Sequence, residues 1–249
     1  MDDREMLEIT FFGNSSFEIS SSETTILVDP YISGNDECPY EIDEIINRAA
    51  GYDAIAVTHL AQDHMGDCLL LATETDTPVI TEPATAYYLG ENGVPEENLT
   101  SIVWGQTATI GNLDVRGLES HHISGKELDD GYLTGLPLAF LISDEEKTLI
   151  HTGDTSIFSD LQLFGELYQP DAALIGIGQA YPHEGTNIEK NIAELTIREA
   201  VLVAEWLDSD TVVPMHYLPS ERAEFVARMN EAEHQTNVRP LRPGESLQI

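Results

Sequence analysis

The chain has few of the residues that several classes of protein require. Of its 249 residues only 11 are Lys or Arg, against 45 that are Asp or Glu, and only two are Cys. Nucleic acids and anionic membranes are bound through clustered Lys and Arg, so the composition argues against both as partners. Cys38 and Cys68 are too few for a disulfide framework and lack a C-x-x-C spacing.

Long apolar segments are also missing. No apolar run approaches the ~18 residues of a transmembrane helix, and the acidic start of the chain leads into no stretch resembling a signal peptide. Hydrophobic residues nevertheless make up 41% of the chain, enough for a globular protein with a sizeable core. We therefore expect a cytoplasmic protein whose partner is a small-molecule substrate, and a homo-oligomer is left open.

The formal net charge is -34. The acidic residues are dispersed, and the longest run is Asp144–Glu146, which argues against a disordered acidic tail. A surface this negative repels itself in dilute buffer, whereas concentrated salt screens the repulsion. The composition resembles that of cytoplasmic proteins from salt-loving organisms, so we expect a halophilic protein. An ordinary acidic protein is the alternative.

Runs of β-branched and aromatic residues bounded by turn residues predict strands. We expect them at Leu7–Phe12, Phe17–Ser20, Thr25–Val28, Ala54–Thr58, Pro78–Thr81, Ser101–Val103, Thr107–Ile110, Leu113–Leu118, Pro137–Ile142, Thr148–His151, Ala172–Ile177, Thr211–Pro214 and Ser246–Ile249. Apolar residues at helical spacing predict helices at Glu41–Ala50, from near Pro83 to Gly90, and at Ile157–Leu167, Ile188–Leu207 and Ser220–Ala232. Without a low-complexity linker or a repeat, we expect one domain, 1–249, of the α/β class, with two mixed sheets face to face and helices outside.

Seven of the eight His residues follow predicted strands within a few residues. They are His59, His64, His121, His122, His151, His183 and His216. Loops at the carboxyl ends of strands converge on a shared crevice in α/β proteins, and His is the commonest metal-binding side chain. The placement therefore favours a joint metal site over seven unrelated loop residues.

The segment Thr58–Asp67 carries the densest set of donors. His59, Asp63 and His64 supply nitrogen and oxygen ligands suited to Zn²⁺ or a similar divalent ion. Alone this H-x₃-D-H pattern is weak. Asp154 and His216 strengthen it because they occupy equivalent positions after later strands.

These segments together resemble the metallo-β-lactamase superfamily, nearest its uncharacterised metal-dependent hydrolases and the ascorbate-phosphate lactonase-like group. The matching segments are Gly13–Phe17 for G-H-x-x-F, Ile26–Pro30 for a strand ending in Asp-Pro, Thr58–Asp67 for T-H-x-H-x-D-H-x-G-D, His122 before Ser124-Gly125, His151–Thr155 for H-x-G-D-T, and Pro214–Tyr217 for P-M-H-Y. The resemblance implies a four-layer αββα sandwich.

The resemblance also implies two metal sites that share Asp154. One would use His59, His122 and Asp154, and the other Asp63, His64, Asp154 and His216, with a hydroxide between the ions. Asp63 would be a ligand and also the catalytic group that steers the hydroxide. Zinc is the expected metal, with manganese or iron as alternatives.

Two residues depart from the family pattern. Asn14 replaces the His of the opening turn, and Ala61 replaces the second His of the metal motif. Ala61 has no donor atom, so we expect an intact second site and a weakened first one. Either His183 or Gln62 is a candidate to fill the gap.

Three nearby residues have two interpretations each. Asp29 either orients a metal-binding His through a hydrogen bond or begins a turn. Asp67 either supports the site or caps a helix. His151 is expected to be structural, or to support a ligand, rather than to be a ligand itself.

The resulting hypothesis is a metal-dependent hydrolase that acts on an ester, a lactone or a phosphodiester through a metal-bound hydroxide. A metal-stabilised binding module with an incomplete first site is the alternative, because Ala61 and Asn14 remove family residues. Oxygen chemistry at iron on the same fold is a third hypothesis, although the chain has no flavin-binding region to support it.

Overall fold

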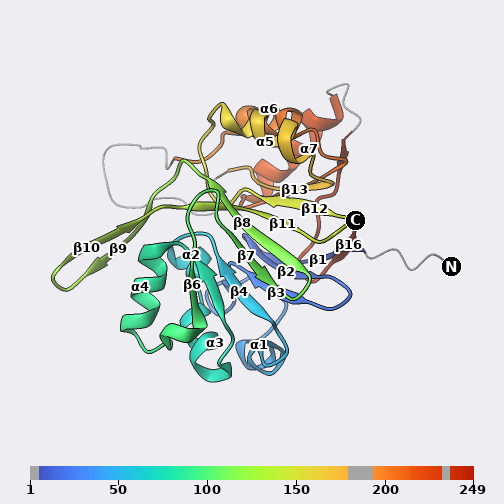
Figure 1. The fold of residues 1–249 in the computed structure, drawn as a ribbon. Coiled ribbons are helices and arrows are strands. Elements are labelled where there is room, and N and C mark those ends of the chain that lie inside the picture. Colours follow the sequence, from blue (N-terminus) through green and yellow to red (C-terminus); the bar gives the residue numbers. More distant parts are fainter. Residues whose placement is uncertain (1–5, 179–192, 232–235) are drawn as a thin grey trace.

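Two seven-stranded sheets lie face to face, with helices outside each of them (Figure 1). The computed structural model describes residues 6–178, 193–231 and 236–249. The first sheet runs, in spatial order, β16 (Ser246–Gln248), β1 (Glu8–Gly13), β2 (Ser16–Ser20), β3 (Thr25–Val28), β4 (Ala54–Val57), β5 (Val79–Thr81) and β6 (Leu99–Ser101). The second runs β15 (Asn237–Val238), β14 (Thr211–Met215), β13 (Ala172–Gly176), β12 (Thr148–His151), β11 (Leu138–Ser143), β8 (Leu113–Glu119) and β7 (Thr107–Ile110).

The helices divide between the two outer faces. Those beside the first sheet are α1 (Ile42–Ala49), α2 (Gln62–Met65), α3 (Cys68–Thr75), α4 (Pro83–Glu91) and the short η1 (Glu96–Asn98). Those beside the second are α5 (Asp160–Tyr168), α6 (Ile197–Leu207) and α7 (Pro219–Glu231). The predicted αββα arrangement is therefore confirmed.

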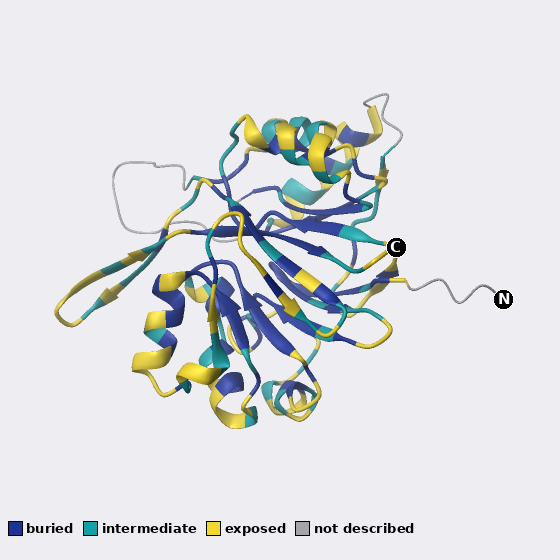
Figure 2. Ribbon diagram, viewed as in Figure 1, coloured by how far each residue is buried: buried dark blue, intermediate teal, exposed yellow. Residues whose placement is uncertain are grey.

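Strand β4 shows how the layers are built. All four of its residues are buried. Ala54 and Ala56 belong to the core between the sheets, whereas Ile55 and Val57 belong to the core between the first sheet and its helices. Successive side chains of a strand point to opposite faces, so a strand covered on both sides has no polar face. A third core packs α5–α7 against the second sheet, and Figure 2 shows the buried residues concentrated in these layers.

Several expected elements have different bounds. The strand expected at Ser101–Val103 is β6 at Leu99–Ser101. The bond from the Ile102 N–H to the Thr81 carbonyl is the last one of its pairing with β5, so the strand does not extend to Val103. The helix expected from Ile157 begins at Asp160, because Ile157 and Phe158 pack against the third core before the helix starts.

The long helix expected at 188–207 is also shorter. A capping box sets the N-terminal end of this helix. The Thr196 side chain accepts from the Glu199 N–H, and the Glu199 side chain accepts from the Thr196 N–H. Helix α6 therefore begins at Ile197, and residues 188–192 lie outside the described part of the chain.

A two-stranded sheet of β9 (Ser124–Leu128) and β10 (Gly131–Gly135) was not expected. It extends away from the body beside α4 (Figure 1). Its residues are mostly exposed or half-buried, so they carry no strong apolar alternation from which a strand could be predicted.

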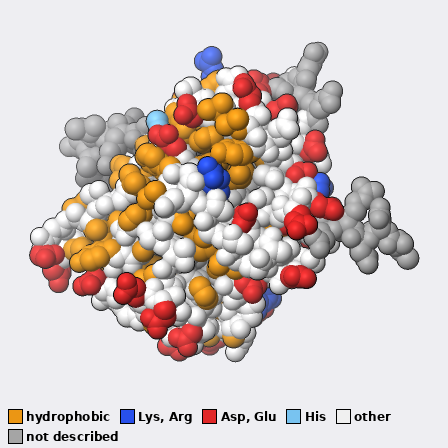
Figure 3. Space-filling model, viewed as in Figure 1, with side chains coloured by type: hydrophobic (Ala, Val, Ile, Leu, Met, Phe, Trp, Pro, Cys, Tyr) orange, Lys and Arg blue, Asp and Glu red, His pale blue; other side chains and the backbone are white. Residues whose placement is uncertain are grey.

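The acidic residues are spread over the surface. In the face drawn in Figure 3, Asp and Glu side chains are scattered around the outline and Lys and Arg are sparse. None of the helices in the described part of the chain combines the length and apolar character needed to cross a bilayer.

Candidate metal centre

Most of the predicted donors follow the ends of neighbouring strands. His59 comes two residues after β4, Asp154 three residues after β12, and His216 directly after β14. Gly153 allows the turn before Asp154, because its φ is +56° and a Cβ there would lie 2.8 Å from the Leu138 carbonyl oxygen. The sheet edge therefore gathers side chains that are far apart in the sequence.

A single helical turn, α2, places the next two donors. It carries Asp63 and His64 in adjacent positions, and the Asn14 side-chain amide donates to the Asp63 carbonyl at 3.1 Å. Gly66 ends the turn with φ +45°, and a Cβ there would lie 2.3 Å from the Pro30 carbonyl oxygen. Asn14, which replaces the family His, thus holds the turn that carries two donors.

The base of the β9–β10 hairpin is tied to the same turn. The Leu60 N–H donates to the Ser124 hydroxyl at 3.0 Å, and that hydroxyl donates to a carboxylate oxygen of Glu82 at 2.8 Å. Glu82 is fully buried at the N-terminus of α4. This chain of bonds fixes the segment after His59 and, through Ser124, the segment that carries His122.

The six predicted ligands lie together in two groups that share Asp154. One group is Asp63, His64, Asp154 and His216, and the other is His59, His122 and Asp154, with donor atoms within 4.8 Å of one another in each. Asp154 Oδ2 lies 3.1 Å from His64 Nε2, 3.4 Å from His216 Nε2 and 3.8 Å from His122 Nε2. His216 Nε2 is also 3.1 Å from Asp63 Oδ2.

Three of the donor atoms at the centre lack hydrogen-bond partners. His59 Nε2, His64 Nε2 and Asp154 Oδ1 are all buried without a hydrogen bond among the described residues. Buried polar atoms are normally satisfied, and imidazole nitrogens beside a carboxylate are suitable ligands for a divalent cation. The residues present therefore fit a metal ion in each group, with the group of His59, His122 and Asp154 offering one donor fewer.

Each His of the two groups is held by its other ring nitrogen. His64 Nδ1 lies 2.7 Å from Asp29 Oδ2, and His59 Nδ1 lies 3.0 Å from the Thr58 hydroxyl. His122 Nδ1 and His216 Nδ1 lie 3.0 and 3.2 Å from the carbonyls of residues 193 and 178. Because a bond at Nδ1 fixes the ring, each Nε2 is left facing the centre.

Electrostatics show how strongly this centre attracts positive charge. Burial lowers the pKa of His216, but the negative charge of Asp154 and the hydrogen bond to Asp63 outweigh it and raise that pKa to about 9. Burial also lowers the pKa of His64. The negative charges of Asp154 and Asp29 outweigh it and hold that pKa well above its usual value. Metal ligation requires neutral imidazole, so a cation would replace these protons.

His59 titrates in the opposite direction. Burial, reinforced by the positive charge of the neighbouring His64, lowers its pKa to about 3. The ring centroids of His59 and His64 are 4.2 Å apart. His59 therefore stays neutral and keeps Nε2 free to bind a cation.

The structure gives the contacts of the three residues with two interpretations. Asp29 is buried and orients His64. Asp67 makes no side-chain cap, and its carboxylate instead accepts from the backbone N–H groups of Ile32 and Ser33. His151 donates from Nε2 to the Ser15 carbonyl at 3.0 Å and belongs to neither donor group, as expected of a structural residue.

Of the candidates to replace the missing His, Gln62 is exposed, and His183 lies outside the described residues. One buried carboxylate was not anticipated. Glu194 Oε2 lies 3.9 Å from His216 Nδ1, and no motif in the sequence marks it. Its only sequence signal is its position just before the capping box of α6.

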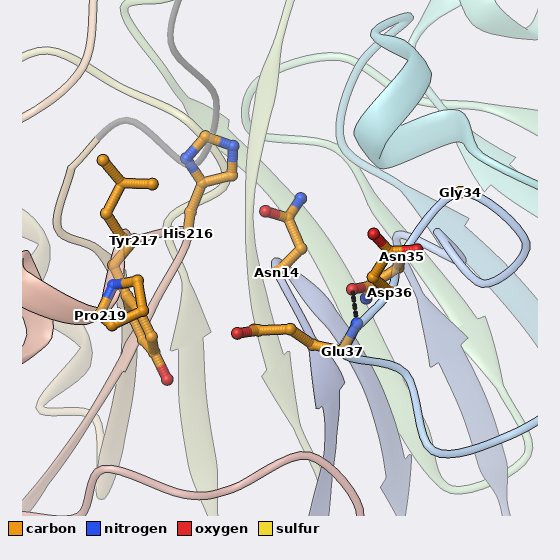
Figure 4. A pocket seen from close by; sticks show the side chains of 9 residues that line it. Asn14, Gly34, Asn35, Asp36, Glu37, His216, Tyr217 and Pro219 are labelled. Carbon is orange, nitrogen blue, oxygen red and sulfur yellow. Dashed lines mark hydrogen bonds between the residues drawn. The ribbon is translucent and has the colours of Figure 1, made fainter.

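A pocket of about 190 Å³ opens beside His216. It is lined by Asn14, Gly34, Asn35, Asp36, Glu37, His216, Tyr217, Leu218 and Pro219. Figure 4 shows Asn14 and His216 side by side, with Glu37 extending from the opposite loop toward the segment that carries Tyr217 and Pro219. His216 is therefore the residue that this pocket shares with the two donor groups.

Comparison with known proteins places this site in a family. The Beta-lactamase superfamily domain matches residues 24–217. A UPF0173 metal-dependent hydrolase of Rhizobium johnstonii is 32% identical over 98% of this chain and 100% of its own length. Igni18, a metallo hydrolase of Ignicoccus hospitalis, superposes with a TM-score of 0.79 at 25% identity, covering 98% of both chains.

A more distant structure shares the fold. CmlA, a diiron beta-hydroxylase of Streptomyces venezuelae, matches with a TM-score of 0.72 at 18% identity over 100% of this chain and 55% of its own. The sequence match to the hydrolases covers nearly the whole chain, and the fold and the two donor groups that share Asp154 agree with it. The chain belongs to the metallo-β-lactamase superfamily, within the UPF0173 family of metal-dependent hydrolases.

Proposed function

We propose that the protein hydrolyses a small ester, lactone or phosphodiester with divalent metal ions, zinc first among them. The observation that carries this proposal is the pair of donor groups that share Asp154, each with buried donor atoms that lack partners. The second group, with Asp63, His64, Asp154 and His216, would hold the more firmly bound ion. His59 and His122 would complete the weaker group with Asp154.

Divalent ions in such a centre supply an activated water and polarise the bond to be cleaved. The chain's own residues set the conditions for that chemistry. Asp29 holds the His64 ring so that Nε2 faces Asp154, and the Gly178 carbonyl does the same for His216. These bonds fix the donors before a ligand binds, which reduces reorganisation during the reaction.

Asp63 has the properties of a residue that both binds metal and orients water. Burial would raise the pKa of its carboxyl, but the hydrogen bond from His216 and the charge of His64 hold that pKa well below its usual value. Its side chain is 25% exposed, whereas that of Asp154 is 4% exposed. Asp63 is therefore an ionised acceptor that water can reach.

A matched pair of substitutions tests the proposal. Asp154→Asn removes the shared carboxylate, and Asp130→Asn removes the same charge from the exposed hairpin turn. Metal per chain after dialysis and hydrolysis of p-nitrophenyl acetate, γ-butyrolactone and bis(p-nitrophenyl) phosphate would be measured for both and for the parent. We expect Asp154→Asn to lose metal and activity together and Asp130→Asn to retain both.

The binding-module alternative predicts a different result. Its specific support is Ala61, which leaves the first group with three donors. A binding module would retain metal and fold but hydrolyse none of the three probes at any metal loading. Hydrolysis that disappears with the metal would exclude it.

A further inference from the structure

The base of the β9–β10 hairpin holds the backbone on both sides of His59. On one side the Thr58 carbonyl accepts from the Leu138 N–H at 3.0 Å, and on the other the Leu60 N–H donates to the Ser124 hydroxyl at 3.0 Å. Ser124 is the first residue of the hairpin, and Leu138 follows its last residue by three positions. The place where the hairpin leaves the body, beside α4 in Figure 1, therefore sets the position of His59.

The same base carries the other imidazole of the three-donor group, which consists of His59, His122 and Asp154. His122 lies two residues before Ser124. Ala61 adds no donor, so this group has one ligand fewer than the other. Fewer ligands leave less binding energy to offset the cost of ordering them. The three-donor group therefore depends more strongly on ligands that are already in place.

A buried carboxylate fixes the hairpin base. Glu82 Oε1 accepts from the Ser124 hydroxyl at 2.8 Å, and Oε2 accepts from the Leu136 N–H at 3.3 Å. The two oxygens also accept from the Ala84 and Thr85 N–H groups at the start of α4. Shorter side chains such as Ser or Asp are the usual helix caps. The longer Glu82 caps the helix and also reaches both ends of the hairpin.

Little space remains around this carboxylate. A Cβ at Gly135, the last residue of β10, would collide with both oxygens of Glu82. A Cβ at Gly131, the first residue of the same strand, would meet nothing within 4 Å. Neither glycine has a positive φ, so close approach rather than backbone conformation distinguishes Gly135. The end of the hairpin is therefore packed directly against Glu82.

We propose that Glu82 and Ser124 are positioning residues for the three-donor group, and that the fixed hairpin base compensates for the donor missing at Ala61. The inference rests on the proposed metal-dependent function. Neither Glu82 nor Ser124 belongs to a donor group. They act through the backbone that carries His59 and His122, so that both rings lie near Asp154 before an ion arrives.

The effect should be confined to one of the two ions. The four-donor group consists of Asp63, His64, Asp154 and His216. Other bonds hold it: Asp29 orients His64, and the carbonyl of residue 178 orients His216. The Asn14 amide in addition holds the turn that carries Asp63. Loosening the hairpin base should therefore weaken the ion of the three-donor group and spare the other.

Ser124→Ala and Thr85→Ala are a matched pair. Each removes a buried hydroxyl that donates to Glu82 Oε1 at 2.8 Å, but only the Ser124 hydroxyl also accepts from Leu60. Calorimetric titration of zinc into the metal-free proteins would give the number of ions and the affinity of each. We expect Ser124→Ala to bind the weaker ion about 10- to 100-fold less tightly, the range for partners that support metal ligands. The tighter ion should be unchanged, and Thr85→Ala should bind both ions as the parent does.

Two further comparisons separate positioning from stability. Ser124→Thr keeps the hydroxyl and should restore the parental affinity. Gly135→Ala keeps every hydrogen-bonding side chain but displaces Glu82, so it should weaken the same ion by about tenfold or more. Gly131→Ala, at the open end of the strand, should change nothing. A loss of stability alone would lower the melting temperature without selecting one ion, and the glycine pair decides the matter if Ser124→Ala does not fold.

The outcomes distinguish this inference from the function beneath it. A parent that binds two zinc ions, with a folded Ser124→Ala that binds the weaker one equally well, would overturn the positioning role and leave the hydrolase intact. Equal weakening of both ions, or a parent that binds only one ion, would overturn it as well. If the parent binds two ions but hydrolyses none of the three probes, the proposed function fails. The zinc affinities would still decide the positioning role, because they do not depend on turnover.

Discussion

Replacing Asp29 with Asn should weaken metal binding about 10- to 100-fold, the range for a partner behind a His ligand. The carboxylate accepts at Oδ1 from the Thr58 N–H and at Oδ2 from the Thr58 hydroxyl and His64 Nδ1, at 2.8, 2.8 and 2.7 Å. With the Asn oxygen retained by the Thr58 N–H, the amide would donate to His64 Nδ1. The ring proton would then move to Nε2, the atom that faces Asp154.

The backbone itself should tolerate the change. Asp29 has φ +46°, a conformation in which Asn is about as acceptable as Asp. The expected loss in affinity corresponds to about 1.4–2.8 kcal/mol. That is the scale of one buried hydrogen bond to a charged group, about 1.5–3 kcal/mol.

Calorimetric titration of zinc into the metal-free protein would measure the effect. Asp53→Asn is the control, because Asp53 also accepts from a backbone N–H, that of Thr25 at 2.8 Å, but at an exposed position away from the centre. Parental affinity and stoichiometry in Asp29→Asn, with an unchanged melting temperature, would refute the idea that this bond sets the His64 tautomer.

Three further predictions concern salt, pH and the missing donor. The melting temperature should rise steeply from low to molar KCl as self-repulsion is screened; a flat or falling curve would remove the halophilic interpretation. In the metal-free protein His216 has its pKa raised to about 9, so the stability it contributes is complete below its unfolded pKa of about 6.5 and is lost as pH rises through the folded value. Thermal melts in chelator from pH 6 to 10 should therefore fall, and an increase would contradict the assignment. Ala61→His should add the absent ligand and raise affinity for a second ion, whereas His183→Ala should change nothing unless His183 already fills the gap; metal titration of both variants distinguishes the two cases.

The sequence was sufficient to predict the layers and the donor set because both depend on local patterns. A predicted strand followed by His59, or by Gly153 and Asp154, can be recognised within ten residues of sequence. The end of the strand then fixes where the residues after it lie in the fold. The seven-stranded sheets then bring those ends together without further information. The family resemblance supplied the pairing of the donors around Asp154.

The burial of Glu194 beside His216 could not be predicted because it depends on a distant contact. Glu194 lies in an irregular segment that passes His216, a residue 22 positions later, and no periodicity records that approach. The start of α6 was predictable in principle from Thr196 and Glu199, which form the capping-box pattern. The apolar periodicity extends further toward the N-terminus than the helix does, and the cap overrides it.

The alternation of side-chain size along β4 has a consequence for the metal centre. The side chains on the inter-sheet face are the methyl groups of Ala54 and Ala56, and the larger Ile55 and Val57 face the helices. A slip of one residue would force the larger pair into the space that the alanines fill and would turn His59 to the opposite face. The small space between the two sheets therefore enforces the register of β4 that directs the His59 imidazole toward Asp154. A bulkier residue at Ala56 would disturb the alignment of the ligands while leaving the hydrogen-bonded ladder available.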